Sequence, residues 1–226
     1  TRVHAPVFSQ DDYSPQAVFL RYQNLMTSWY THVHVYDKFL TDAISTFRLI
    51  FEYIRDEVPK GNSLVYNGTA GKDRTGVLIM LILLLAGVDK DTVAREYELT
   101  TFGLTPDHPV IKDKYISTLS KIKAKAEAAG ISAELMEKEL SQGRENWTLE
   151  EDGFKNLISS RFEAMLSTIE LFETKYGGII NYMKEYLKFS DEEIVTIYHN
   201  IVKLNNDGGF EDYSFVNWSH RAPKNK

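Results

Sequence analysis

The sequence predicts an α/β fold, a sheet flanked by helices, on three observations. The run Ser63–Tyr66 (SLVY) is short, apolar and bounded by turn residues, which is typical of a buried strand. A glycine-containing loop, Asn67–Gly76, follows it and leads into a wholly apolar helix from Val77, which Gly87 ends. Amphipathic helical patterns fill most of the rest of the chain.

The N-terminal part adds few further strands. Thr1–Gln23 is turn-rich, whereas Trp29–Tyr36 (WYTHVHVY) carries the β-branched and aromatic residues typical of a short strand or of an extended approach to a helix. Apolar residues over Phe39–Ile54 recur at three- and four-residue steps, which predicts an amphipathic helix. The predicted sheet is therefore short of strands. Either further strands lie in Thr1–Tyr36, or N-terminal strands of the sheet are missing from this chain.

The second half is helical by its pattern. Two segments, Thr148 with Glu151 and Ser190 with Glu193, match the Ser/Thr-x-x-Glu capping box at a helix start. The predicted helices are Asp91–Tyr97, Asp113–Ala129, Ser132–Leu140, Phe154–Tyr176, Ile179–Leu187 and Ile194–Leu204.

Composition excludes several classes of protein. The chain has 226 residues, of which 43% are hydrophobic and 26% charged, as in ordinary globular proteins and unlike disordered or fibrous ones. A net charge of −6 argues against a nucleic-acid-binding surface. Because there is no cysteine, disulfides, zinc–thiolate sites and a thiol nucleophile are excluded.

No targeting or membrane segment is evident. Thr1–Gln10 lacks the basic and apolar regions of a signal peptide. The longest apolar run, Val77–Ala86, is too short to cross a bilayer. We therefore expect a cytoplasmic protein that contacts neither membrane nor nucleic acid.

The loop has the chemistry of an anion site. A strand–loop–helix order places backbone N–H groups at a helix N-terminus, where partial positive charge binds phosphate-like anions. Arg74 adds a planar guanidinium and Lys72 a point charge. A Walker A loop is rejected, because two residues rather than four separate Gly68 from Gly71. The alternative is a glycine-rich turn with solvated charges. The predicted anion-binding residues are Gly68, Thr69, Ala70, Gly71, Lys72, Asp73, Arg74 and Thr75.

These residues carry a resemblance to a known family. Ser63–Leu104 resembles the signature region of the fungal and bacterial tyrosine-phosphatase-like family of the protein tyrosine phosphatase superfamily. That family's loop reads His-Cys-x-Ala-Gly-Lys-Asp-Arg-Thr-Gly, and Asn67–Gly76 reads Asn-Gly-Thr-Ala-Gly-Lys-Asp-Arg-Thr-Gly. Val93–Thr100 and Lys175–Ile194 resemble the family's later helices. The resemblance implies a tyrosine-phosphatase-type sheet with flanking helices and a phosphatase-like domain over 1–204, in which 105–175 form a helical lid.

Two departures bear on the implied mechanism. The family's nucleophilic cysteine falls on Gly68, and the histidine before it falls on Asn67. The superfamily's cysteinyl-phosphate chemistry needs a thiolate at this position. Thr69 is out of register and has no evident activating base. Hydrolysis by that route is therefore not expected.

Other residues allow two roles each. Asp73 could act with Lys72 and Arg74 as a catalytic group, or hold Arg74 in place. By the resemblance, Thr75 would assist a thiolate, and here it is expected to cap the helix. His32 and His34 share one face of the predicted strand, but two histidines without a third ligand make a poor metal site, so we expect neither metal nor cofactor.

Further expectations concern three single residues and one charged segment. His108 lies in a predicted surface loop, from which it could also reach a pocket. Tyr97 and Arg161 are candidates for the rim of a pocket. The lysine-rich segment is expected to be a solvated helix face: Lys114, Lys121, Lys123 and Lys125.

Three functions stay open at this point. The first is a pseudophosphatase, a binding module that holds a phosphorylated or otherwise anionic ligand. The second is a repurposed enzyme that uses the anion cradle for acid–base chemistry on a small anionic metabolite. The third is an active tyrosine or dual-specificity phosphatase whose nucleophile has been mutated. A second chain or an N-terminal segment would complete the sheet. The aromatic tail over 205–226 would dock on the lid or on another protomer.

Overall fold

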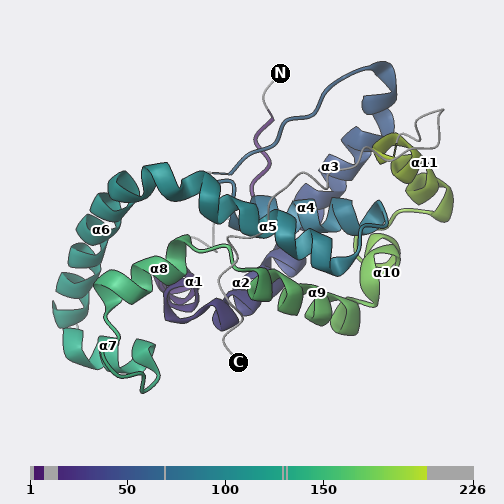
Figure 1. Cartoon of the computed structure of the whole chain (residues 1–226). Coiled ribbons are helices and arrows are strands. Elements are labelled where there is room, and N and C mark those ends of the chain that lie inside the picture. Colours follow the sequence, from purple (N-terminus) through teal and green to yellow (C-terminus); the bar gives the residue numbers. More distant parts are fainter. Residues whose placement is uncertain (1–2, 8–14, 69, 129, 131, 203–226) are drawn as a thin grey trace.

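Every regular element of this protein is a helix in the part of the chain that the computed structural model describes: residues 3–7, 15–68, 70–128, 130 and 132–202 (Figure 1). The predicted α/β fold with a tyrosine-phosphatase-type sheet is therefore wrong. The segment Ser63–Tyr66, predicted as a strand, has no regular secondary structure. Leu64 and Tyr66 pack against the core while Val65 is 88% exposed, so the segment has the alternation of a strand without its ladder.

The observed secondary structure differs most from the predicted one in the helices before the loop. Trp29–Tyr36, predicted as a strand, begins a helix because Ser28 accepts a hydrogen bond from the Tyr30 amide (3.2 Å) and the buried positions follow a helical period. The helical pattern over Phe39–Ile54 spans two helices that break at Ala43. The elements are α1 (Pro15–Thr27), α2 (Trp29–Asp42), α3 (Ile44–Asp56) and the 3-10 turn η2 (Val58–Lys60).

After the loop the predicted helices are present with shifted ends. The long pattern over Phe154–Tyr176 breaks at Ser159, whose backbone is extended. The elements are α4 (Asp73–Leu85), α5 (Lys90–Leu104), η3 (Thr105–Asp107), α6 (His108–Ala128), α7 (Ala133–Ser141), the π-helical turn η4 (Leu149–Gly153), α8 (Phe154–Ile158), α9 (Phe162–Tyr176), α10 (Gly178–Glu185) and α11 (Asp191–Ile201). A full capping box starts α11, with Ser190 and Glu193 bonded reciprocally.

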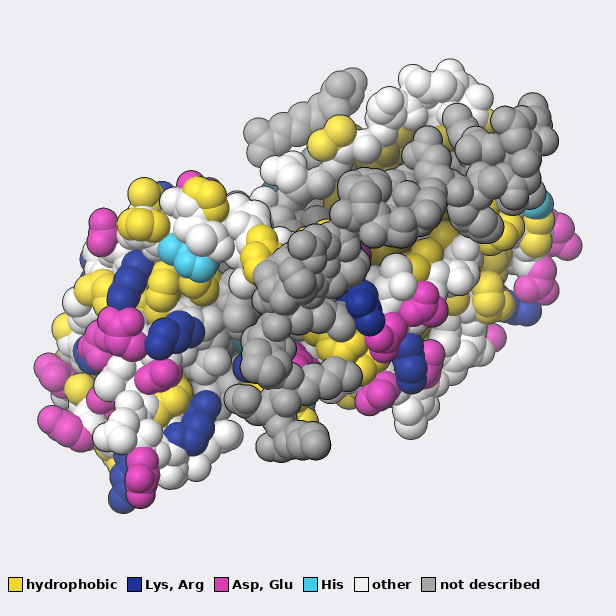
Figure 2. All heavy atoms as spheres, in the orientation of Figure 1, with side chains coloured by type: hydrophobic (Ala, Val, Ile, Leu, Met, Phe, Trp, Pro, Cys, Tyr) yellow, Lys and Arg dark blue, Asp and Glu magenta, His cyan; other side chains and the backbone are white. Residues whose placement is uncertain are grey.

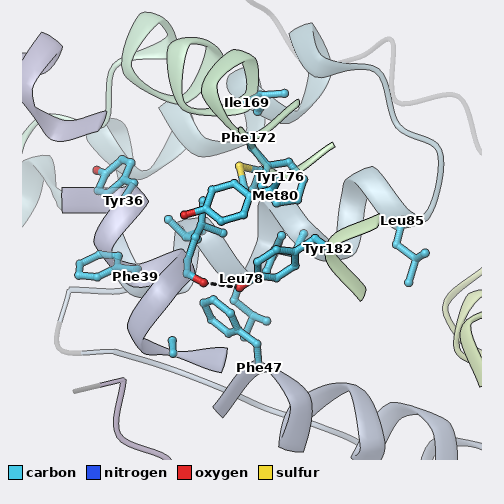
Figure 3. Packing of buried hydrophobic residues seen from close by; sticks show 14 of the residues in the cluster. Tyr36, Phe39, Phe47, Leu78, Met80, Leu85, Ile169, Phe172, Tyr176 and Tyr182 are labelled. Carbon is cyan, nitrogen blue, oxygen red and sulfur yellow. Dashed lines mark hydrogen bonds between the residues drawn. The ribbon is translucent and has the colours of Figure 1, made fainter. Parts of the chain in front are cut away.

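A large hydrophobic core joins α2, α4, α5, α9 and α10. Its centre is rich in aromatic rings, which lie together in Figure 3. The Phe172 ring centroid is 5.3 Å from that of Tyr182, and the Tyr182 hydroxyl donates to the Leu40 carbonyl (2.6 Å). This core holds α4, and with it the loop, against α2 and α9.

A second, smaller core lies at the end of the molecule that carries α6 and α7 (Figure 1). Helix α1 links the two cores, because Leu25 is buried in the large one and the next residue, Met26, in the small one. The other buried members of the small core are Tyr115, Leu119, Met136, Leu140, Leu149 and Phe154.

Acidic and basic side chains are interspersed over the α6–α7 end on the face shown in Figure 2. None of the helices described is long and apolar enough to cross a membrane. The tail over 205–226 lies outside the described residues. The expectation that a second chain or an N-terminal segment completes a sheet stays a prediction.

Candidate functional site

The loop meets the N-terminus of α4, which lacks a side-chain cap. Gly71 has a φ of 63°, a left-handed conformation that favours glycine, and Lys72 at the N-cap position makes no capping hydrogen bond with its side chain. The first-turn N–H groups of α4 therefore have no side-chain acceptor in the described part of the chain. They retain the positive end of the helix dipole for a ligand.

Gly68 stands at the base of this loop. Its amide donates to the Thr75 hydroxyl (3.1 Å), so Thr75 closes the loop and is not the expected helix cap. A Cβ added at Gly68 would lie 3.3 Å from the same oxygen, which means that a side chain here would sit beside the Thr75 hydroxyl. Thr69 lies outside the described residues.

The three charged side chains of the loop differ in their burial and in their partners. Arg74 is half-buried, and no hydrogen bond or ion pair joins its guanidinium to another described residue. The Lys72 side chain is only 3% exposed, and its Nζ lies 2.8 Å from Asp73 Oδ1. The same nitrogen donates to the Ser159 carbonyl at the α8–α9 junction (3.1 Å). Lys72 is thus turned into the protein, where its charge already has a partner.

A buried chain of polar groups lies beneath the loop. The Tyr36 hydroxyl donates to Asp73 Oδ1 (2.8 Å) and contacts the Tyr97 hydroxyl. Burial raises the pKa of Asp73, but the Lys72 ammonium and the hydrogen bonds outweigh it and the pKa is lowered overall. Burial raises the pKa of Tyr36 well above its ordinary value. The network therefore holds an ionised Asp73 between a lysine and a neutral tyrosine at neutral pH.

His32 lies one helical turn before Tyr36 on α2 and is fully buried. Its Nε2 donates to the Leu25 carbonyl (2.9 Å). Burial, with help from the Lys72 charge, lowers the pKa of His32 from 6.5 to about 4. His34, predicted to share a face with it, is exposed instead, because the segment is helical.

Folding stability should therefore depend on the pH through His32. Between pH 6.5 and about 4 the unfolded chain binds a proton at His32 that the folded chain does not, so stability is lost as the pH falls through this window, by about 3 kcal/mol in all. Urea unfolding at several pH values should show a shallower slope for His32→Gln than for wild type. The control His34→Gln should keep the wild-type slope, and equal slopes for all three proteins would contradict this assignment.

Gly76 lets α4 approach α5 closely. A Cβ at this position would lie 2.8 Å from Cδ2 of the Tyr97 ring. Since the Tyr97 hydroxyl contacts Tyr36, this close approach also places the polar chain under the loop.

Of the remaining predicted residues, Tyr97 belongs to this network, whereas His108 and Arg161 contact aromatic rings outside it. The His108 ring packs edge-on against Phe154 (6.3 Å between centroids), and Arg161 stacks over Trp29 (5.6 Å). Tyr97, expected at a rim, is buried. Lys114 and Lys121 are exposed, as a solvated face requires, but Lys123 is half-buried and pairs with Glu150, and the Lys125 side chain lies outside the described residues. Among the described residues no group of three or more metal-ligating side chains could hold a metal ion.

A comparison with known families finds one match. A family model described as "Tyrosine phosphatase family" matches residues 1–203. The chain belongs to the tyrosine phosphatase family. No curated protein and no solved structure matches it.

The 68–76 loop stays the candidate site predicted from the sequence, and the structure places beneath it supporting residues that the sequence did not reveal. Tyr36 and His32 stand far before the loop in the chain, and no motif marks them. Their four-residue spacing places them on one face of a helix and equally on one face of a strand, so the spacing alone could not show that they lie beneath the loop.

Proposed function

We propose that this member of the tyrosine phosphatase family binds a phosphate or similar anion in the 68–76 loop and does not hydrolyse phosphoesters through a cysteinyl-phosphate. The observation that carries the proposal is Gly68. It stands where the family's loop has its cysteine, and the chain contains no cysteine at all. Without a thiolate at the loop base, the covalent intermediate has no nucleophile.

Two hydrogen-bond donors of the loop, which make no side-chain hydrogen bond in the described structure, support anion binding. The Arg74 guanidinium has no described partner, and the α4 N-terminus has no side-chain cap. Both can donate charge-assisted hydrogen bonds to phosphate oxygens. Lys72 and Asp73 largely neutralise each other, so the net positive charge offered to a ligand comes from Arg74 and the helix N-terminus.

Acid–base chemistry by Asp73 or Lys72, as in a repurposed enzyme, is less well supported. The Asp73 carboxylate already accepts from Tyr36 and Lys72, and its pKa is lowered. A group that stays ionised and engaged in this way is poorly suited to deliver a proton near neutral pH.

Calorimetry with inorganic phosphate tests the proposal. Arg74→Ala should weaken binding by at least about tenfold, because charge-assisted hydrogen bonds contribute roughly 1.5–3 kcal/mol each. Lys138→Ala removes a charge from the exposed face of α7, at the far end of the molecule, and should leave the affinity unchanged. Equal affinity for wild type and Arg74→Ala would mean that the loop is only architectural.

A further inference from the structure

The residue before Arg74 is a potential competitor of any anionic ligand. Asp73 carries a carboxylate, and a guanidinium binds a carboxylate as readily as a phosphate. Elsewhere in this protein, an arginine does bind the aspartate next to it in the chain. In the last turns of α3, Arg55 closes on the neighbouring Asp56 with two hydrogen bonds of 2.7 Å each. A similar closure at the loop would occupy Arg74.

At the loop the carboxylate is held elsewhere. Asp73 Oδ1 accepts from the Tyr36 hydroxyl (2.8 Å) and lies 2.8 Å from Lys72 Nζ. Both partners are themselves fixed, since Tyr36 is fully buried in α2 and Lys72 donates to the Ser159 carbonyl (3.1 Å). No hydrogen bond or ion pair between Asp73 and Arg74 occurs in the described structure.

We propose that Tyr36 is a positioning residue of the anion site: with Lys72, it holds the Asp73 carboxylate away from Arg74 and so keeps the guanidinium free for the ligand. The inference rests on the proposed function, because it matters only if the loop binds an anion. This role gives a reason for the wholly buried Tyr36 of this chain to direct its hydroxyl at Asp73, the neighbour of Arg74.

Removal of one hydroxyl group tests this role. In Tyr36→Phe, Asp73 loses one of its two anchors and can pair with Arg74. A partly exposed pair of this kind is worth up to about 1 kcal/mol, so inorganic phosphate should bind about fivefold more weakly by calorimetry at pH 7. The double variant Tyr36→Phe/Asp73→Asn should regain affinity, because an amide cannot form an ion pair with arginine.

Tyr182→Phe is the matched control. It removes a buried tyrosine hydroxyl from the same core, one that donates to the Leu40 carbonyl and lies outside the loop network. Any loss of packing or stability common to buried tyrosines should appear in both variants, but only Tyr36→Phe should lose phosphate affinity.

The outcomes separate this inference from the proposed function. A wild-type protein that does not bind phosphate overturns the proposed function, and the inference falls with it. A wild-type protein that binds, with Tyr36→Phe binding equally well, overturns the inference alone. A double variant as weak as Tyr36→Phe overturns it too, because the loss would then come from loop packing. Should Tyr36→Phe fail to melt cooperatively, Lys72→Gln with and without Asp73→Asn decides by the same loss and recovery.

Discussion

Gly68→Cys should turn over p-nitrophenyl phosphate at a rate at least about 100-fold above the wild-type background, a small part of the factor of about 10⁶ that a nucleophile supplies in a serine protease. Gly68 has no positive φ, and its Cβ would need only a slight shift of the Thr75 hydroxyl. The α4 N-terminus and Arg74 should lower the pKa of the new thiol and so favour its thiolate. We expect little hydrolysis of a phosphopeptide, because by the resemblance Asn67 still takes the place of the family's histidine.

Two controls make this result specific. Gly68→Ala adds the same Cβ without a thiol and should stay inactive. Gly68→Cys/Arg74→Ala should lose the gained activity, since the arginine both binds the phosphate and stabilises the thiolate. Clear wild-type turnover that survives Arg74→Ala in highly purified protein would show that a different nucleophile exists, and the assignment of Gly68 as the missing nucleophile position would be wrong.

Phe172→Ala should lower the free energy of unfolding by about 3–5 kcal/mol, a large share of the roughly 5–15 kcal/mol that a domain of this kind possesses. Phe172 is fully buried on α9, and its ring contacts those of Tyr176 and Tyr182 (Figure 3). Its removal would leave a cavity where α9 packs on α10 in the large core.

The matched control for this cavity is Phe102→Ala on α5, where the phenylalanine is 43% exposed. It should cost about 1 kcal/mol or less, because the side chain leaves little buried volume behind. Urea unfolding followed by circular dichroism measures both. Similar losses for the two variants would mean that Phe172 does not lie at a tightly packed position.

The sequence was most informative where local chemistry decides the structure. Gly87 ends the apolar helix as expected, with a φ of 83°, and Ser190 with Glu193 forms the expected capping box. Local chemistry could not decide whether a sheet forms. The Ser63–Tyr66 run has the composition of a strand, but a strand also needs a partner, and local composition contains no information about one.

The hydrogen-bond network beneath the loop could not be predicted from the sequence, for a related reason. The motif identified Asp73 and Arg74, but it could not show that Asp73 faces Tyr36 and Lys72. The contact between Asp73 and Tyr36 joins α4 to α2 across 37 residues of chain. Such contacts arise from helix packing, so they become visible only once the helices are placed.

The division into two hydrophobic cores has a consequence for cooperativity. Leu25 and Met26 face different cores from one helix, and the smaller core, built mainly from α6–α8, also meets the larger one at Leu157 of α8, which packs against both. Regions with separate cores open as separate units, each with its own opening free energy and amide-exchange protection. The α6–α7 end, which lies beyond the contacts of α8 with the loop and the larger core, can therefore fluctuate open while the loop stays folded against α2 and α9. Trp147 packs on the small core. Amide exchange at Trp147 and amide exchange in the loop then report on different opening events.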